Sequence, residues 1–268
     1  MTRRIALRIA YDGTNYAGWQ NQDNALAVQQ VIEEALSRLS GGGRVPITGA
    51  SRTDAGVHAM GQVAHFDTET RIPAEKFSFA LNTMLPPDVR IQQSWEAEPD
   101  FHARFSTAGK VYAYTIVNAP HASAMLGRYS AHCPVPLDVE KMHAAAQDIV
   151  GAHDFSVFMA SGGTSKTFVR EMKAAQVERA GDQICFMVWG TGFLYNMVRI
   201  IAGTLVLIGQ GKLPPDALSR AIASHDRLDL GFTAPAQGLT LMRVLYPGQD
   251  DVARAILRQK LLFNVENA

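Results

Sequence analysis

The chain is poor in cysteine and has no long hydrophobic run. Its 268 residues include only Cys133 and Cys185, which form no C-x-x-C pair, so we expect reduced and mostly structural thiols. The longest apolar stretch, residues 200–208, is far shorter than the ~20 residues that a membrane span needs. Arg8 interrupts the apolar stretch near the N-terminus, which argues against a secretory signal. We therefore expect a cytoplasmic protein that does not enter a membrane.

An excess of charge is also absent, because 25 Lys and Arg residues balance 25 Asp and Glu residues. The total does not indicate a strongly basic nucleic-acid-binding protein, but binding depends on where the charges cluster. Hydrophobic residues make up 47% of the chain, which excludes disorder as its main state. The composition is that of a globular protein large enough for one or two domains.

Hydrophobic periodicity predicts a mixture of strands and helices with hairpin-like turns in both halves of the chain. This mixture favours an α+β fold over a doubly wound α/β fold. No Pro-, Gly- or Ser-rich linker separates the halves, so we expect two lobes that share one continuous sheet, residues 1–107 and residues 108–268. The predicted strands are 5–11, 45–49, 61–66, 111–117, 172–178, 184–190 and 239–246; the predicted helices are 28–39, 72–85, 138–150, 193–208, 214–224 and 252–262.

The most informative segment lies between two predicted strands, at residues 50–62. It places Arg52, Asp54 and His58 within seven residues. Loops between rigid strands often carry catalytic groups, and an arginine near an aspartate favours the ionised carboxylate, which can act as a nucleophile or a base. The alternative is a turn in which Asp54 bonds to local backbone and pairs with Arg52.

Three further features allow both a functional and a structural interpretation. His58, His65 and Asp67 contain metal-ligating groups, as a metal-dependent hydrolase of nucleotides would, but the spacings preferred by zinc are absent, which favours structural histidines. Tyr112 and Tyr114 share one face of a predicted strand, either as a platform for a nucleobase or as part of the core. Arg199 lies within an apolar predicted helix, where it must find a partner or face solvent.

The loop sequence decides between these interpretations, because it resembles the signature of the TruA family of tRNA pseudouridine synthases. The resemblance extends over residues 5–246, with blocks in the family's order. The loop reads Gly49-Ala50-Ser51-Arg52-Thr53-Asp54-Ala55-Gly56-Val57-His58-Ala59, and the other blocks are Tyr11-Asp12-Gly13, Gly18-Trp19-Gln20, Gly61-Gln62-Val63, His65-Phe66, Asp100-Phe101-His102-Ala103-Arg104-Phe105-Ser106, Tyr112-Ala113-Tyr114, Asp154-Phe155, Met197-Val198-Arg199 and Gly238-Leu239.

The resemblance implies a homodimeric isomerase that converts uridine to pseudouridine in the anticodon stem-loop of tRNA, at tRNA positions 38, 39 and 40. It implies no cofactor and no metal. It also implies two ferredoxin-like lobes joined in one mixed, mainly antiparallel sheet, in agreement with the fold class predicted from periodicity. The same fold without catalysis, as a tRNA-binding module, is the alternative; the intact Asp54 and Tyr112 favour the enzyme.

Roles for individual residues follow from the resemblance. Asp54 matches the catalytic aspartate, and the family leaves open whether this carboxylate attacks the sugar C1′, attacks the uracil C6 or promotes elimination. Arg52 is expected to orient Asp54 and to hold the target nucleotide out of the stack. Tyr112 matches the tyrosine that packs on the target base, Arg199 matches an arginine that pairs with the catalytic carboxylate, and Leu239 is expected to pack under the base.

A basic cleft for RNA is expected from Arg52 together with Lys110, Lys166 and Arg170, with acidic residues on other faces. Two positions depart from the family pattern. Ser51 stands where glycine is common, and Lys166 stands where many members carry arginine, which loses a bidentate contact. Both departures bear on efficiency or substrate range rather than on the chemistry.

Overall fold

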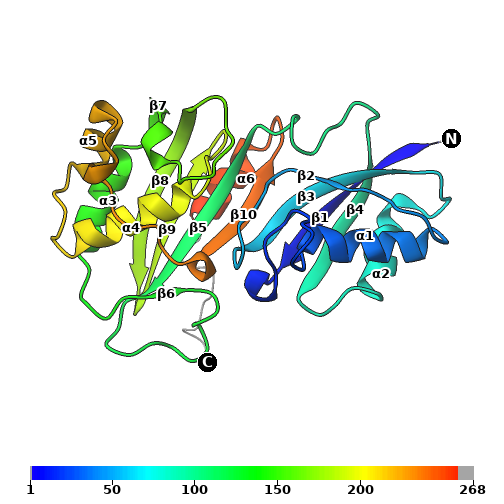
Figure 1. Cartoon of the computed structure of the whole chain (residues 1–268), viewed down its shortest axis with the longest axis horizontal. Helices are drawn as coiled ribbons and strands as arrows, with labels where there is room; N and C mark the ends of the chain where they lie inside the picture. The colour runs from blue at the N-terminus through cyan, green and yellow to red at the C-terminus, as the bar shows by residue number, and fades with distance from the viewer. Residues whose placement is uncertain (1, 259–268) are drawn as a thin grey trace. The chain divides into compact units, whose positions relative to one another are not determined.

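The computed structural model of the chain describes residues 2–258, which form two compact units. Unit 1 takes the chain up to Ala108 together with Leu241–Pro247, and unit 2 takes Gly109–Thr240 and the described residues after Pro247 (Figure 1). The sequence contains no signal for the return of Leu241–Pro247 to unit 1, so the division predicted between residues 107 and 108 leaves it out.

Unit 1 is built on a sheet with the order β4-β1-β3-β10, in which β1 is antiparallel to both of its neighbours. Its central strand β1 (Arg3–Tyr11) pairs with β3 (His58–Thr68) on one side and with β4 (Val89–Ala97) on the other. The short strand β2 (Thr48–Gly49) pairs with β3, and β10 (Leu239–Leu245) belongs to unit 1 from Leu241 onwards. Ile5, Leu7 and Ile9 of β1 are fully buried, as the period-two pattern predicts, and the small Ala6 between them is buried as well.

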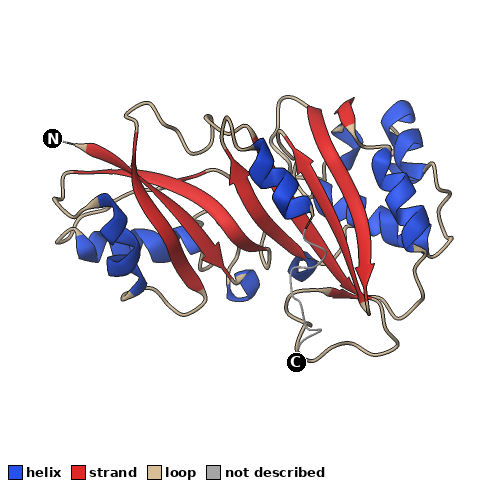
Figure 2. Cartoon of the chain, turned by 180° about the vertical axis from the view of Figure 1, so that it is seen from behind, coloured by secondary structure: helices blue, strands red, loops and turns tan. Residues whose placement is uncertain are grey.

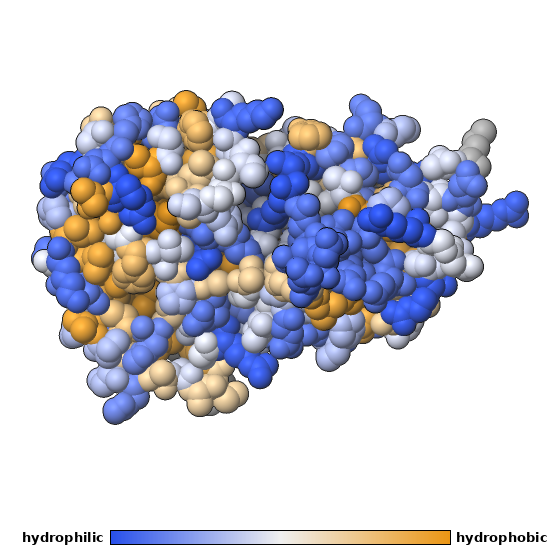
Figure 3. Space-filling view, in the orientation of Figure 1, coloured by the Kyte–Doolittle hydropathy of each residue, from blue (hydrophilic) through white to orange (hydrophobic). Residues whose placement is uncertain are grey.

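Two helices cover one face of this sheet, α1 (Val28–Leu39) and α2 (Phe77–Asn82), the latter preceded by a 3-10 turn at Ala74–Lys76 (Figure 1). Helix α1 has the bounds that its periodicity predicts and buries Val28, Ile32, Ala35 and Leu36. Its opposite side is polar, and the surface over it is mainly hydrophilic (Figure 3). The amphipathic pattern thus orients α1 on the sheet.

Unit 2 contains a second sheet segment with the order β5-β9-β8-β7, in which each neighbouring pair is antiparallel. Its strands are β5 (Gly109–Val117), β7 (Gly151–Asp154), β8 (Val169–Ala180) and β9 (Gln183–Gly190), and the short β6 (Ala131–His132) runs parallel to β5. The expected α+β class, with a mixed and mainly antiparallel sheet, is confirmed.

Helices lie on both faces of the unit 2 sheet. Helices α3 (Val139–Gln147), α4 (Met197–Gly209) and α5 (Ala217–Ser224) form a layer on one face, and α6 (Asp250–Leu257) lies on the other (Figure 1 and Figure 2). Helix α4 is buried almost all round, which matches its unusually apolar sequence. Both cysteines are buried and free, and burial raises the pKa of Cys185 to about 12.

Three predictions for unit 1 and the C-terminus need correction or completion. Strand β4 was not predicted, because at this sheet edge the polar Gln92 and Gln93 interrupt the alternation. The helix predicted at 72–85 is shorter, since α2 covers only Phe77–Asn82. The predicted terminal helix 252–262 corresponds to α6 as far as Leu257, and its residues 259–262 lie outside the described residues.

No helix among the described residues is long and apolar enough to cross a membrane.

Candidate active site

The Arg-Thr-Asp segment lies in unit 1, on the loop that joins β2 to β3. The start of the loop is attached to β3 by a backbone bond of 2.8 Å from Ala50 N–H to the Val63 carbonyl. The fully buried side chain of Gln62 then holds Ser51 from both sides: its Oε1 accepts from Ser51 N–H at 3.2 Å, and its Nε2 donates to the Ser51 carbonyl at 2.6 Å. The path of the chain into Arg52 and Asp54 is therefore fixed by a buried amide.

Residues of this loop alternate between the interior and the surface. Ser51 and Thr53 are buried, whereas Arg52 is exposed and Asp54 is half-buried. The Thr53 hydroxyl lies 2.8 Å from the Tyr11 hydroxyl, and the Thr53 carbonyl accepts from Trp19 N–H at 3.1 Å. The neighbouring Asp54 thus carries a carboxylate within reach of solvent on a backbone that Thr53 anchors.

Two glycines let residues 13–19 pack directly on the loop. A Cβ at Gly13 would overlap the Val57 carbonyl, and a Cβ at Gly18 would lie 2.5 Å from the Thr53 carbonyl oxygen. Gly18 also has a φ of +96°, which side-chain-bearing residues rarely adopt. Asp54 itself begins a turn, because its carbonyl accepts from Val57 N–H at 3.1 Å. The Tyr-Asp-Gly and Gly-Trp-Gln blocks therefore form the support of the Arg-Thr-Asp loop.

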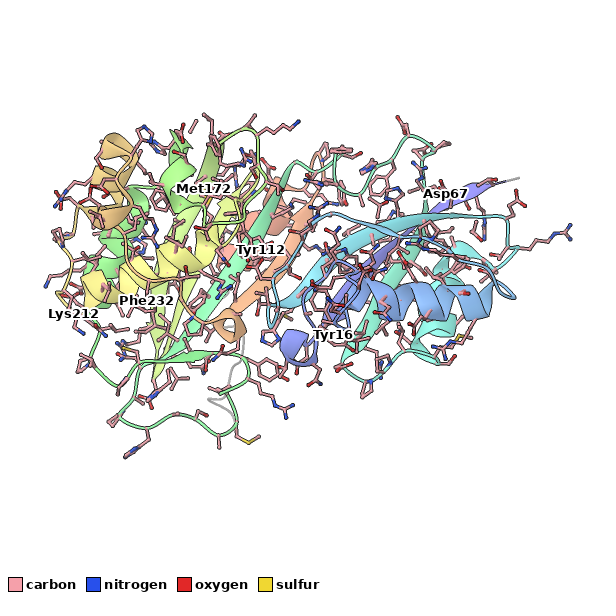
Figure 4. All side chains as sticks on the ribbon, viewed as in Figure 1. Tyr16, Asp67, Tyr112, Met172, Lys212 and Phe232 are labelled. Carbon is pink, nitrogen blue, oxygen red and sulfur yellow. The ribbon has the colours of Figure 1, made fainter. Side chains whose placement is uncertain are left out.

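Asp88 in turn fixes the supporting segment. Its carbonyl accepts from Asp12 N–H at 2.9 Å, and its Oδ1 accepts from the Tyr16 hydroxyl at 2.7 Å (Tyr16 is labelled in Figure 4). Burial and the negative charge of Asp88 raise the pKa of Tyr16 well above its ordinary value, so this phenol stays a neutral donor.

Glu33, a buried carboxylate on α1, positions the segment that leads into β2 and from there into the loop. Glu33 Oε1 accepts from Ile47 N–H at 3.0 Å and from Gln29 Nε2 at 2.8 Å, while Asn21 Nδ2 donates to Oε2 at 3.1 Å. Gln29 Nε2 also lies 3.1 Å from the Ile47 carbonyl. Ile47 immediately precedes β2, so Glu33 and Gln29 set the position of the strand that leads into the loop. Glu33 and Gln29 were not among the residues that sequence reasoning selected, and Gln62 appeared there only within the Gly61-Gln62-Val63 block, without a role.

The three candidate metal ligands of unit 1 have structural roles. The Nδ1 atoms of His58 and His65 accept from the backbone N–H groups of Gly13 and Ala103, at 3.0 and 3.2 Å. Asp67 receives two bonds from the Arg4 guanidinium, at 2.7 and 2.8 Å (Figure 4). Within residues 2–258 no three His, Cys, Asp or Glu side chains form a group that could hold a metal ion. Both histidines therefore hold the backbone of neighbouring segments through a ring nitrogen.

The burial of His65 predicts a pH-dependent stability. Desolvation, with smaller contributions from Arg4 and His102, lowers the pKa of His65 from 6.5 to about 4. The unfolded chain therefore binds more protons between these two pH values, so the free energy of unfolding should fall as the pH drops from 6.5 to 4. Urea unfolding at pH 7 and at pH 4.5 gives the free energy of unfolding at each pH. This free energy should fall less in His65→Asn than in the wild type, because asparagine keeps an acceptor but does not titrate. An equal loss in both proteins would contradict this assignment.

In unit 2, Tyr112 and Tyr114 lie on the same face of β5 but differ in their surroundings. Tyr114 is fully buried and donates from its hydroxyl to the Pro235 carbonyl at 2.8 Å, so it is a core residue. Tyr112, labelled in Figure 4, is 6% exposed and meets the ring of Phe193 edge to face, with 5.1 Å between the ring centroids. A platform made of both rings is therefore excluded.

The remaining candidates of unit 2 are distributed over several elements. Lys110 is half-buried on β5, and Leu239 is buried at the first position of β10. Arg170 is half-buried on β8, where its side chain lies 3.4 Å from the position of a Cβ on Gly192, next to the Phe193 that contacts Tyr112. Lys166 is exposed on the segment before β8. The structure thus places Arg170 against the Gly192 backbone and leaves Lys166 on the surface.

Arg199 is half-buried in the first turn of α4 and is held at two atoms. Its Nε donates to the Ala234 carbonyl at 2.7 Å, and its Nη1 donates to Asn196 Oδ1 at 2.7 Å. The backbone is also joined to the same segment, because Ala234 N–H donates to the Arg199 carbonyl at 3.1 Å. A cation within an apolar helix is therefore accommodated by specific acceptors.

Comparison with known proteins agrees with the resemblance seen in the sequence. The family model described as tRNA pseudouridine synthase matches residues 8–106 and 145–247. A relative from Ruminiclostridium cellulolyticum named tRNA pseudouridine synthase A is 51% identical over 245 residues, which cover 91% of this chain and all of the relative. Relatives of the same name from Acetivibrio thermocellus and Brevibacillus brevis are 49% and 46% identical, again over 91% of this chain and their full length. The chain therefore belongs to the tRNA pseudouridine synthase family.

Proposed function

We propose that this protein isomerises uridine to pseudouridine in tRNA, with Asp54 as the catalytic carboxylate. The observation that carries the proposal is the half-buried Asp54 on a backbone held by Gln62, Thr53 and Trp19, in a chain of this family. The backbone that carries this carboxylate is pre-organised, because little of its path has to be set when the substrate arrives.

The reaction balances without a cofactor. The N1–C1′ bond of the uridine breaks, the uracil turns, and a C5–C1′ bond forms; C5 releases its proton and N1 gains one, with no net oxidation. Asp54 attacks C1′, attacks C6 or promotes elimination, and each route requires an ionised carboxylate against the ring. The target nucleotide has to leave its stack before any of these steps.

We assign the other candidate residues to the same reaction. The exposed side chain of Arg52 is suited to holding the extruded nucleotide. Tyr112 packs on the base and moves a proton through its hydroxyl, Leu239 packs under the base, and Arg199 supplies positive charge to the reaction. Lys110, Lys166 and Arg170 attract the phosphate backbone.

We also propose the anticodon stem-loop as the substrate, at tRNA positions 38, 39 and 40, and a cytoplasmic homodimer as the active form. These finer assignments rest on the sequence resemblance. Shape and phosphate contacts rather than base sequence would select the stem-loop.

Mapping of pseudouridine by mass spectrometry tests this function directly. Unmodified tRNA transcripts with uridines at positions 38, 39 and 40 should acquire pseudouridine there after incubation with the pure protein, also in the presence of a chelator. A matched transcript with cytidines at these three positions is the control and should stay unmodified. Binding of tRNA without any pseudouridine would instead support the non-catalytic tRNA-binding module.

A further inference from the structure

We propose that Asn196 is a positioning residue, which sets the orientation of the Arg199 guanidinium through its side-chain oxygen. This inference rests on the proposed function, in which Arg199 takes part in the isomerisation. Asn196 immediately precedes α4, and Arg199 lies three residues later, in the first turn of that helix. Both residues belong to unit 2.

In the hydrogen bond between Arg199 and Asn196, the donor and the acceptor are defined by chemistry. A guanidinium can only donate hydrogen bonds, so the Asn196 atom that faces Arg199 Nη1 at 2.7 Å must be the carbonyl oxygen. The Ala234 carbonyl accepts from Nε at the same distance. Two acceptors on different atoms of a planar group restrict both its position and its rotation.

The use of Asn196 in this contact departs from the usual behaviour of an asparagine before a helix. Its oxygen would ordinarily accept from a backbone N–H of the first turn and stabilise the helix. Asn196 makes no such capping bond to α4. The side-chain oxygen is therefore directed to the Arg199 side chain rather than to the helix backbone.

The backbone of Asn196 is also unusual. Its φ of 60° and ψ of 4° place it in the left-handed region, which among the non-glycine residues of the described chain is shared only by His225. Strained residues of this kind persist where the surroundings determine them, and they concentrate at functional sites. Asparagine tolerates this region better than most residues, so it combines the backbone geometry with an acceptor.

The Ala234 carbonyl, the other acceptor of the guanidinium, also lies in a fixed position. The segment that contains Ala234 packs closely on α4, because a Cβ on Gly203 would overlap the Phe232 carbonyl (Phe232 is labelled in Figure 4). The Thr204 hydroxyl accepts from Gly231 N–H at 2.9 Å. The Ala234 carbonyl thus has a fixed position, and the Asn196 oxygen adds a second acceptor on a different nitrogen of the guanidinium.

Replacement of Asn196 by glycine is the decisive test, because glycine adopts the left-handed backbone readily and removes the side-chain amide, including the oxygen that accepts from Arg199. We expect kcat for pseudouridine formation to fall about 10- to 100-fold, the effect of losing a hydrogen bond to a charged group. KM, tRNA affinity and the thermal midpoint should stay close to those of the wild type. Asn196→Asp, which retains an oxygen at this position, should recover most of the rate.

A matched control separates this effect from a change in backbone strain. His225→Gly relaxes the other left-handed residue, at the end of α5, and should leave kcat unchanged. Arg199→Gln should reduce kcat strongly, and the addition of Asn196→Gly to it should reduce kcat no further, because a positioning residue acts only through its partner.

The possible failures are distinguishable. A normal kcat in Asn196→Gly, beside a strongly impaired Arg199→Gln, would overturn the positioning role alone. Additive losses in the double variant would overturn it as well. A wild-type protein that forms no pseudouridine, or an Arg199→Gln variant that is fully active, would instead overturn the proposed function or the role of Arg199 in it.

Discussion

Replacement of Asp54 by asparagine should abolish pseudouridine formation while the fold and tRNA binding persist. The substitution preserves the size of the side chain and removes its negative charge, which each of the possible routes requires. Loss of a group that acts directly in the chemistry reduces kcat by about four orders of magnitude or more. The loop should keep its path, since Gln62 holds Ser51 and Tyr11 holds Thr53 independently of the Asp54 side chain.

Release of tritium from C5 of uridine-labelled tRNA gives the rate, and a filter-binding titration gives the affinity. Asp23→Asn is a matched control, because it removes a carboxylate from an exposed position of the same unit and should leave the rate unchanged. Turnover of Asp54→Asn at a substantial fraction of the wild-type rate would remove this carboxylate from the catalytic role. Loss of tRNA binding together with activity would point to a structural role for Asp54.

Local patterns are sufficient to predict much of the fold. Helix α1 has the predicted bounds because its apolar residues follow the helical period on a single face. Strand β5 was predicted two residues short, since Gly109 and Lys110 lack the apolar alternation of residues 111–117. Predictions succeed here because burial of one face determines both the pattern and the structure.

Contacts between distant segments account for what the sequence did not predict. Strand β4 pairs with β1, from which almost eighty residues separate it, and its polar residues Gln92 and Gln93 interrupt the alternation by which a strand is predicted. The return of Leu241–Pro247 to unit 1 is likewise a property of the whole chain. Periodicity reports which face of a segment is buried, not which segment buries it.

The candidate site, like the fold, combines features that the local sequence predicts with contacts between distant segments that it does not. Residue types and their positions were enough to single out Arg52, Asp54, Tyr112 and Arg199, and the family resemblance added a role for each. The roles of the buried polar residues that hold the loop were not predicted, although Glu33 gave a signal: it is an acidic residue at a position within the apolar face of α1. A buried carboxylate needs several donors, so such a position indicates a network even when its members cannot be identified.

Gly18→Ala should reduce kcat about 100-fold, although the substitution adds a single methyl group outside the loop. The new Cβ would lie 2.5 Å from the Thr53 carbonyl oxygen and 3.1 Å from the Asp54 carbonyl carbon. These are backbone atoms, so the loop itself has to move, and a displacement of about 1 Å at a reacting group costs about 10²-fold in rate. Steady-state kinetics of tritium release should show the loss mainly in kcat.

The comparison with Gly42→Ala separates displacement of the loop from backbone strain. Gly42 has a similar φ of +104°, but a Cβ there would meet nothing within 4 Å. Both variants should therefore lose about 1–2 kcal/mol of stability from the strained backbone, while only Gly18→Ala loses activity. Equal activity in the two variants would show that the Asp54 loop tolerates displacement, and that the close packing of residues 13–19 on it serves stability rather than catalysis.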